Sequence, residues 1–352
     1  MIEIRTFEGD AAELSEFTTS MWRKSYEGKM PVPLWSPQLF RRELLPTDDD
    51  PRDYLVAAYD GTKIVGSHPA RAVRISLHGE ERSATWGSFL TVDPDYRRQG
   101  IAQKMHAEFQ RRHQERGAAV NFGYLYIRSI KSMGPKFWLK QPEGTMVVRK
   151  PGVWLRALDH RAAARFELYW FEAWGSRMLS LFQRRPKPPR DMTGIRPYRS
   201  EDLSDCMELV GDRAASVDLA YLWGPDELAR LLDCEGLSRT VVLQRDGRAA
   251  GLVNYYRLEF LGRCPMEVGI IDLLAFGKLP SRDRRRLLRA ALFQMADEGL
   301  KAAMCLRGSW YAGSQLLRAG FYPFPPEYYY VGNRMQPDVP LEKVRRLHVL
   351  WR

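Results

Sequence analysis

The sequence repeats one pattern of segments in its two halves, and this repetition limits the folds that the chain can adopt. An Ile-Arg dipeptide at residues 4–5 and again at 195–196 precedes an acidic helix start in both places. An Asp-Gly turn signal follows at residues 60–61 and again at 246–247, each time before a strand-like segment. Because these offsets agree within a few residues, we expect an internal duplication that produces two similar domains.

The first half alternates short apolar segments with turn signals before it reaches a helix. Segments typical of strands cover residues 54–58, 63–67, 72–77, 84–92 and 118–126. Between the last two, Ile101, Met105, Phe109 and His113 recur at helical spacing, and Gly117 ends the helix. The sequence therefore predicts a mixed α/β (α+β) fold with two tandem domains, each a mixed, mostly antiparallel twisted sheet flanked by helices.

The length of the chain also favours two domains, because 352 residues are many for a single core. We place the first domain at residues 1–150 and the second at 193–352, with an aromatic helix and a Pro-rich linker at 151–192. Residues 162–182 predict a helix crowded with Phe, Tyr and Trp, followed by a basic, Pro-rich stretch at 184–190. This helix is interpreted either as packed between the domains or as a hydrophobic surface that faces a membrane.

The charge of the chain indicates anionic partners. A net charge of +11 and a pI near 9.5 are compatible with nucleic acid, a membrane surface or a polyphosphate cofactor. No recognisable nucleic-acid motif accompanies the charge, so nucleic acid is not expected as a partner. No segment approaches the roughly 18 apolar residues of a membrane span, and the start of the sequence does not resemble a signal peptide. We therefore expect a cytoplasmic protein.

The cysteines and histidines form no pattern typical of metal binding or nucleophilic catalysis. Cys206, Cys234, Cys264 and Cys305 are widely spaced and show neither CxxC nor a metal spacing with His, which favours free thiols. The histidines show neither HExxH spacing nor a Ser/His/Asp order. We expect no metal.

The segment VDPDYRRQGIA at residues 92–102 lies between a predicted strand and a predicted helix. Helix N-termini attract anions, so acidic or Ser/Thr caps are usual there, whereas cations oppose the helix dipole. Two arginines at this place therefore indicate a site that holds an anionic ligand.

Residues 97–102 (RRQGIA), preceded by Val92 and Pro94, resemble the Q/R-x-x-G-x-G/A signature of the GNAT superfamily of acyl-CoA-dependent N-acyltransferases. The resemblance implies that successive backbone amides hold the pyrophosphate of coenzyme A, and that the arginines add charge-assisted contacts. It also implies acetyl-CoA or another acyl-CoA as cosubstrate. The expected binding residues are Leu90, Thr91, Val92, Arg97, Arg98, Gln99, Gly100, Ile101 and Ala102.

The same resemblance implies direct transfer of the acyl group to a primary amine in a ternary complex. In this family, the strand before the loop pairs with the pantetheine arm, and the next strand, here residues 120–126, splays away. Many members carry a Tyr that protonates the leaving thiolate, but Trp138 occupies its approximate position, and an indole cannot serve as that acid. The candidate catalytic residues are therefore Tyr124, Tyr126 and Ser88, with core packing as the alternative role of the tyrosines.

Acceptor recognition is expected in the aromatic segment at residues 21–35. Trp22, Tyr26 and Trp35 either line a pocket or are ordinary core residues, and Trp86 completes the candidate substrate-contacting set. We expect the acceptor to be a small-molecule or peptide amine.

The second half lacks the loop that carries this resemblance. Its corresponding segment, residues 279–287 (LPSRDRRRL), has no glycine, so its backbone cannot approach a phosphate as closely. Residues 316–321 nevertheless resemble the terminal helix and Gly-Phe strand of the same fold. A tandem form with a degenerate second copy is similar to mycothiol synthases and protein N-myristoyltransferases. Two alternatives stay open: a catalytically inactive CoA-binding or sensor protein, and a basic protein that binds nucleic acid or a membrane surface.

Overall fold

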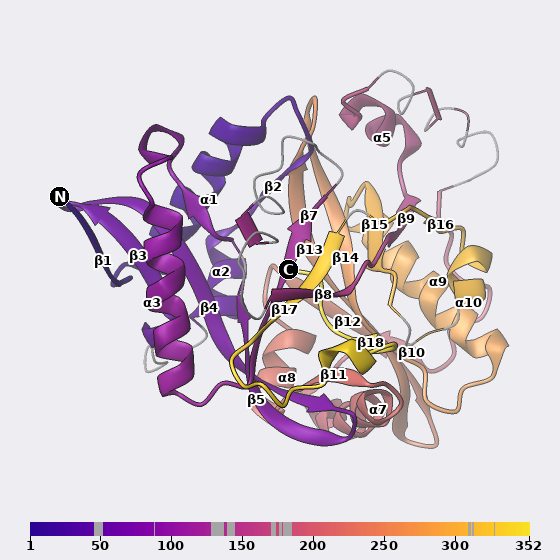
Figure 1. Ribbon diagram of the computed structural model, residues 1–352. Helices are drawn as coiled ribbons and strands as arrows, with labels where there is room; N and C mark the ends of the chain where they lie inside the picture. Colours follow the sequence, from indigo (N-terminus) through magenta and orange to yellow (C-terminus); the bar gives the residue numbers. More distant parts are fainter. Residues whose placement is uncertain are drawn as a thin grey trace.

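The computed structural model describes residues 1–45, 52–87, 89–127, 137–138, 145–169, 174–175, 178, 185–308, 311, 313–326 and 328–352. As predicted, the chain forms two mixed β-sheets flanked by helices, and the C-terminus lies at the centre of the molecule (Figure 1).

The first sheet has the strand order β1, β3, β4, β5, β7, β17 and β8. These strands are β1 (Ile2–Thr6), β3 (Leu55–Asp60), β4 (Lys63–Leu77), β5 (Glu80–Gly87), β7 (Val120–Tyr126), β17 (Tyr328–Arg334) and β8 (Thr145–Arg149). β5 and β7 are parallel, whereas the other neighbours in this order are antiparallel. The strand predicted at 84–92 is divided, because β5 ends at Gly87 and β6 (Thr91–Val92) pairs with β4 instead.

The second sheet repeats this plan with the order β10, β12, β13, β14, β15, β9 and β16. These strands are β10 (Ile195–Pro197), β12 (Ser238–Arg245), β13 (Arg248–Leu261), β14 (Pro265–Ala275), β15 (Ala302–Leu306), β9 (Val153–Ala157) and β16 (Tyr322–Pro323). β14 and β15 form the parallel pair, in the place that β5 and β7 take in the first sheet.

The two sheets exchange strands. β17, from the end of the chain, lies beyond β7 in the first sheet, and β9, from the first half, lies beyond β15 in the second. β2 (Val32–Leu34) pairs with β13 of the second sheet, while β11 (Leu219–Leu222) pairs with β4 of the first and with β18 (Leu347–His348). Each sheet therefore includes strands from both halves of the sequence, and the boundaries at 150 and 192 stay a prediction.

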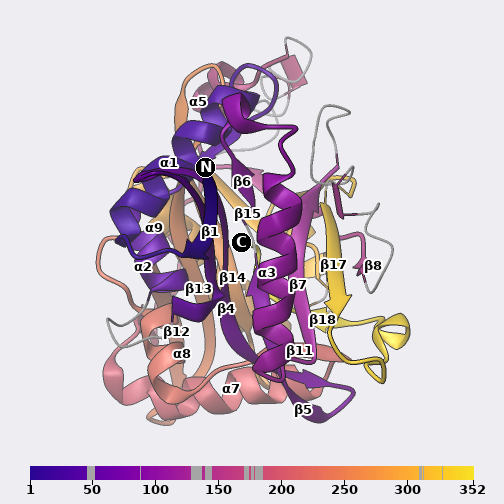
Figure 2. The same ribbon diagram turned by 60° about the vertical axis from the view of Figure 1, so that its left-hand side comes forward.

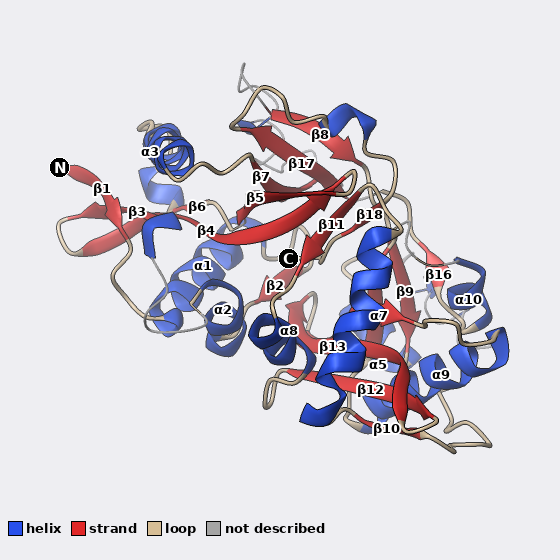
Figure 3. Ribbon diagram, turned by 90° about the horizontal axis from the view of Figure 1, so that it is seen from below, coloured by secondary structure: helices blue, strands red, loops and turns tan. Residues whose placement is uncertain are grey.

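The helices form layers on both sides of the sheets. They are α1 (Ala11–Tyr26), α2 (Pro37–Leu44), α3 (Ile101–Glu115), α5 (His160–Phe166), α7 (Leu203–Ala215), α8 (Pro225–Leu232), α9 (Ser281–Asp297) and α10 (Gly313–Arg318). Seen from below, α1, α2, α7 and α8 lie between the two sheets, where their apolar faces share one core, and α3 and α9 cover the outer faces (Figure 3). Figure 2 shows α3 running along the first sheet, with its N-terminus near β6.

The helix predicted at residues 162–182 is not continuous. α5 ends at Phe166, because Glu167 leaves the helical conformation with φ −54° and ψ 133°. Residues 167–169 are not helical, and most of residues 170–184 lie outside the described part of the chain. The segment is rich in aromatic residues but lacks a regular helical spacing of apolar residues, so the sequence did not predict the end of α5 at Phe166.

Candidate functional site

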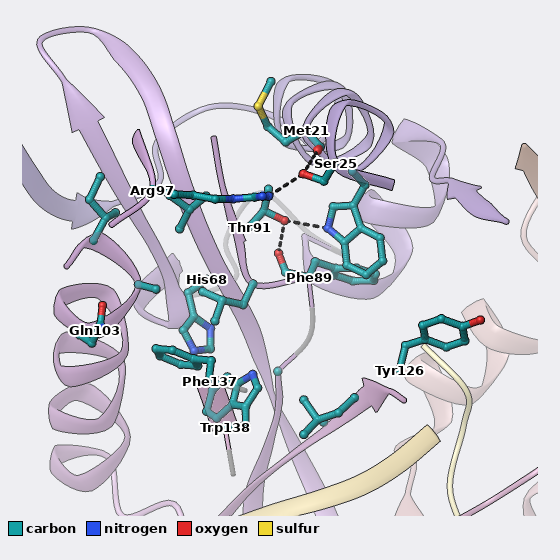
Figure 4. Close-up of a pocket in the computed structure, with 18 of the residues that line it drawn as sticks. Met21, Ser25, His68, Phe89, Thr91, Arg97, Gln103, Tyr126, Phe137 and Trp138 are labelled. Carbon is teal, nitrogen blue, oxygen red and sulfur yellow. Dashed lines mark hydrogen bonds between the residues drawn. The ribbon is translucent and has the colours of Figure 1, made fainter. Parts of the chain in front are cut away.

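A cavity of about 590 Å³ lies where the first sheet opens, between α1, the start of α3 and β7 (Figure 4). β5 pairs with β7 only at residues 84–86, opposite 120–122. Beyond Gly87 the chain turns away from β7, and β6 continues along β4, so β6 and β7 diverge. At the point of divergence, a Cβ atom on Gly123 would lie 2.6 Å from the Gly87 carbonyl oxygen, so only glycine permits this approach.

The turn before the loop is attached to α1 by Asp93. Its carboxylate, which is 3% exposed, accepts hydrogen bonds from Lys24 Nζ at 3.1 Å and Lys63 Nζ at 3.4 Å. It also accepts from the amide of Asp95 and caps the short 3₁₀ helix at Pro94–Tyr96. Burial opposes ionisation of Asp93, but the Asp95 amide and the Lys24 ammonium lower its pKa below the usual value. The start of the loop is therefore held in one position relative to α1.

The loop itself presents its backbone amides to the cavity. Arg98 and Gly100 have φ angles of 64° and 73°, in the left-handed region, and α3 begins directly after Gly100 without a side-chain cap. The amides of Arg98, Gln99 and Gly100 make no hydrogen bond within the described chain. A Cβ atom on Gly100 would meet no protein atom within 4 Å, so the space beside it is open. Alternating conformations of this kind aim consecutive N–H groups at one point and create a site for an anion.

The two arginines of the loop have different surroundings. Arg97 Nη2 donates to Ser25 Oγ at 2.5 Å, and that hydroxyl donates to the Met21 carbonyl at 2.8 Å (Figure 4). This chain of hydrogen bonds holds the Arg97 guanidinium beside the cavity. Arg98 is exposed and has no ion pair among the described residues, so its charge is available to a ligand.

The backbone between β5 and β6 is held by a second chain of hydrogen bonds. Trp22 Nε1 donates to Thr91 Oγ1 at 3.0 Å, and Thr91 Oγ1 donates to the Phe89 carbonyl at 2.7 Å. Phe89 has a φ of 60°, an uncommon conformation for a bulky residue that these contacts stabilise. This irregular stretch forms the wall of the cavity opposite β7.

A polar group lies on the cavity floor and was not predicted from the sequence. Asn333 is paired in register with Asn121 on one side and with Thr145 on the other, and all three line the cavity. Asn121 donates to Thr85 Oγ1 at 3.0 Å. Both polar atoms of the Asn333 side chain and the hydroxyl of Thr145 are buried without a hydrogen-bond partner in the described part of the chain. Buried amides usually have partners, so this group is suited to contact a bound ligand.

His68 is a further residue of the cavity that sequence reasoning missed. It is buried on β4, stacks on Phe109 with ring centroids 3.9 Å apart, and meets Trp138 edge-on at 5.6 Å. Neither ring nitrogen has a partner in the described chain. Burial, with smaller contributions from His106 and His113, lowers the pKa of His68 well below its usual value. The cavity wall therefore carries a neutral imidazole.

Of the three predicted catalytic residues, two tyrosines line the cavity and the serine lies outside the described part of the chain. Tyr124 and Tyr126 both line the cavity, and Tyr124 Oη donates to the Leu350 carbonyl at 2.8 Å. Burial raises the pKa of Tyr124 well above its usual value, so its hydroxyl stays protonated. In Figure 4, the hydroxyl of Tyr126 points away from Arg97 and Thr91. Ser88 lies outside the described residues.

Most of the predicted cofactor residues line this one cavity: Leu90, Thr91, Val92, Arg97, Arg98, Gly100, Ile101 and Ala102. Gln99 is not among the lining residues. Of the predicted substrate residues, Trp22 and Tyr26 line the cavity, whereas Trp35 and Trp86 do not. Trp35 lies 4.9 Å from Phe89, and Trp86 lies 5.7 Å from the same ring, both in edge-on packing. The roles of all these residues stay predictions.

Carboxylates are absent from the described lining of the cavity, which includes no Asp or Glu. Across the described residues, no group of three or more His, Cys, Asp or Glu side chains is placed to hold a metal ion. Cys206, Cys234, Cys264 and Cys305 are free thiols. Within the same residues, no helix combines the length and apolar character needed to cross a membrane.

Known proteins share both the loop region and the overall fold. Residues 11–131 match the family model described as an acetyltransferase (GNAT) domain. Two structures of Saccharomyces cerevisiae N-myristoyltransferase with bound myristoyl-CoA match over 100% of this chain. One has a TM-score of 0.78 at 14% identity over 89% of that chain. The other has a TM-score of 0.77 at 13% identity over 84% of that chain.

A conserved protein of unknown function from Enterococcus faecalis V583, described as a probable N-acyltransferase, also matches. Its TM-score is 0.55 at 11% identity, over 96% of this chain and 73% of that one. No curated protein sequence matches the chain. At these identities, the structural matches show a shared fold.

Proposed function

We propose, from the premise that residues 11–131 form a GNAT domain within a tandem GNAT-like fold, that this protein is an acyl-CoA-dependent N-acyltransferase. It transfers an acetyl or longer acyl group from acyl-CoA to a primary amine of a small molecule or peptide, by direct attack in a ternary complex. The observation that carries this proposal is the junction between β6 and α3, where unbonded backbone amides and two arginines face one cavity.

The chemistry of this junction fits the pyrophosphate of coenzyme A. Open amides at a helix N-terminus and adjacent guanidinium groups supply the donors and positive charge that a diphosphate requires. From there, the diverging β6 and β7 leave a passage toward Trp138, Tyr124 and the polar floor at Asn333. A pantetheine arm in this passage would carry the thioester to the interior of the cavity. The aromatic wall of Phe89, Phe137 and Trp138 suits an apolar acyl group.

In the proposed reaction, the amine nitrogen attacks the thioester carbonyl carbon, the C–S bond breaks, and the thiolate leaves with a proton. With no carboxylate in the described lining, the amine arrives neutral and passes its proton to water. Positioning of the two reactants then supplies much of the rate enhancement. We assign proton donation to the thiolate to Tyr124, which would exchange its acceptor from the Leu350 carbonyl to sulfur. Tyr124 then regains a proton from the water that received the proton of the amine, so that it ends the cycle protonated.

The competing function is a CoA-binding sensor without catalysis. The absence of a carboxylate in the described lining and the engaged hydroxyl of Tyr124 favour this alternative. The test is release of free coenzyme A thiol from acetyl-CoA and from myristoyl-CoA by the pure protein, with a panel of primary amines and peptides. Amine-dependent release supports the transferase, whereas tight binding without release for any amine supports the sensor.

Substitution of Tyr124 tests its assignment as the proton donor. We expect Tyr124→Phe to lower kcat about 10²-fold with little change in KM, since a positioned general acid typically contributes a factor of this size. Tyr328→Phe is the matched control, because the Tyr328 ring packs 6.3 Å from that of Tyr124 but does not line the cavity. Equal kcat values for Tyr124→Phe and the wild type would remove Tyr124 from the mechanism.

A further inference from the structure

A second cavity, of about 650 Å³, lies on the far side of the molecule from the proposed acyl-CoA site. It is lined by residues of α9, β9, the end of α10 and the Pro-rich segment at residues 185–191. The helices α9 and α10 lie toward the right of Figure 1. Its lining is dominated by cations: Arg156, Arg185, Lys187, Arg190, Arg282, Arg285, Arg286, Arg289 and Arg318. Asp191 is the single carboxylate among the described lining residues.

Helix geometry gathers these charges on one side of α9. Arg282, Arg285, Arg286 and Arg289 are three, four and seven positions apart, so they share one face of the helix. Neighbouring like charges on one helix face are unfavourable unless something neutralises them. The opposite face of α9 packs on the second sheet through Leu287, Ala291 and Met295. The cationic face is therefore left toward the cavity.

The Pro-rich segment is tied to α9 at both ends and forms a fixed rim. Arg185 Nη2 donates to the Ala296 carbonyl at 2.9 Å, near the end of the helix. Arg286 donates to the carbonyls of Asp191 at 3.2 Å and Thr193 at 3.0 Å, near its start. Pro186, Pro188 and Pro189 restrict the chain between these ties. The cavity is thus a built space and not a chance gap under a loop.

The charges in the cavity are largely unneutralised. Arg286 pairs with Asp191 at 2.9 Å and with Asp283 at 2.7 Å. The other eight cations of the lining have no ion pair with any described residue. Seven of these eight are exposed. Arg156 is the exception among them.

Arg156 is a half-buried cation without a counter-charge. It lies on β9 between Trp154 and Leu158, whose side chains belong to the core under α9, so it points to the same side of the sheet. Its Nε atom is buried and has no hydrogen-bond partner in the described chain. Burial and the nearby Arg289 lower the pKa of Arg156 to about 10. A guanidinium in this position is costly unless an anion completes the site.

We propose that this second cavity binds a small polyphosphate anion, a linear di- or triphosphate either free or as part of a nucleotide. Guanidinium groups match phosphate oxygens in paired hydrogen bonds, and several of them converge here on one concave space. The volume lies in the range of small-ligand sites. A duplex is much larger than a cavity of about 650 Å³, and a bilayer needs a flat or convex cationic face, whereas these charges line one small concave space. The proposal does not depend on the proposed acyl transfer.

The test is calorimetric titration of the full chain with inorganic triphosphate. The variant Arg285→Glu/Arg289→Glu reverses two exposed charges of the cavity, and Arg318→Glu reverses one from a different element. Arg41→Glu is the matched control, an exposed arginine of α2 without an ion pair among the described residues. Each titration is repeated with the Gly100→Glu substitution also present, so that binding of triphosphate at the proposed acyl-CoA site does not contribute to the signal. Circular dichroism and thermal unfolding confirm that each variant is folded.

We expect the wild type, Gly100→Glu and Arg41→Glu to bind triphosphate with the same affinity within about twofold, and both cavity variants to bind roughly tenfold or more weakly. Absence of binding to the folded wild type would overturn the proposal. So would equal binding by the cavity variants. Binding to phosphatidylserine vesicles or to a DNA duplex, but not to triphosphate, would assign the charge to a macromolecular surface instead.

Discussion

Two junctions take equivalent places in the two sheets: the one between β6 and α3, and the one between β14 and α9. They differ in the groups that they offer to an anionic ligand. The first spans residues 93–100, and it presents unbonded amides and two left-handed residues to a cavity. The second spans residues 276–280, and its chain turns directly into α9 after Pro280. The shorter connection leaves no comparable loop.

The second junction also carries its own anion. Asp283, in the first turn of α9, is 4% exposed and pairs with Arg286 at 2.7 Å and with Arg245. The amides of Asp283 and Arg284 donate to the Pro280 carbonyl, so they are not available to a ligand. A protein carboxylate thus takes the place that an external phosphate would need. In the second copy the chain supplies its own anion near the helix start, whereas in the first copy we propose that a ligand supplies it.

The largest expected effect concerns the interdependence of the halves. Residues 1–192 alone lack β17 and β11, and residues 193–352 alone lack β9 and β2. We expect neither fragment to unfold cooperatively in urea or to show native near-UV circular dichroism, because each sheet loses a strand from within its order, β17 between β7 and β8 or β9 between β15 and β16. Mixing the fragments should restore both signals. A single fragment that unfolds cooperatively would contradict the interlocked description.

The next effect tests the internal anion of the second junction. Asp283→Ala leaves the Arg245 and Arg286 guanidinium groups without this carboxylate, and we expect a loss of about 2 kcal/mol in the free energy of unfolding. Asp297→Ala, an exposed position at the end of the same helix, is the control and should stay within about 0.5 kcal/mol of the wild type. Acyl-CoA affinity should be unchanged in both. Equal stability of the two variants would show that Asp283 is not an essential counter-charge.

The pH dependence of stability distinguishes the outer core under α3 from the outer core under α9. His106 and His113 are buried on α3, and burial lowers the pKa of each to about 4. The buried residues of α9 include no histidine. Since the unfolded state takes up these protons first, stability is complete above about pH 6.5 and falls as the pH drops toward 4, by up to about 1.4 kcal/mol per pH unit for each histidine.

Urea unfolding at several pH values measures this slope. His106→Met removes one titrating group from a buried site and should make the dependence shallower by up to about 1.4 kcal/mol per pH unit. Leu288→Met on α9 is the matched control and should leave the slope unchanged. Identical slopes for His106→Met and the wild type would contradict a neutral, buried His106.

The sequence predicted the parts of the site that depend on local chemistry. The glycine and arginines at 97–100 indicated a loop before the helix, and the structure places Arg97, Arg98 and Gly100 of that loop at the cavity, while its role in anion binding stays a prediction. The duplication of the fold and its two mixed sheets were also predicted and are confirmed. The break in the strand between Gly87 and Thr91 was not predicted, because all of residues 84–92 have a composition typical of one strand.

Other features could not be predicted because they depend on contacts between distant segments. Asn333 and Thr145 reach the cavity on β17 and β8, and no local period indicates that these strands join the first sheet. His68 is an isolated histidine in the sequence and becomes notable only beside Trp138. Within one aromatic segment, Trp22 lines the cavity, whereas Trp35 packs against the ring of Trp22 and does not line it. This difference depends on the three-dimensional packing of the segment and could not be predicted from its composition.

The central claim is that the β6–α3 junction binds the pyrophosphate of acyl-CoA, and one calorimetric titration with acetyl-CoA and myristoyl-CoA tests it most directly. It compares the wild type with Gly100→Glu and Gly117→Glu. The two glycines lie at opposite ends of α3 with φ angles of 73° and 70°, and a Cβ atom at either would meet open space. The substitutions therefore introduce the same charge and the same backbone strain.

We predict that the wild type and Gly117→Glu bind acyl-CoA with similar affinity, and that Gly100→Glu binds roughly 100-fold more weakly or not at all, because its carboxylate repels the diphosphate. Equal binding by Gly100→Glu and Gly117→Glu, or no binding by the wild type, would contradict the claim.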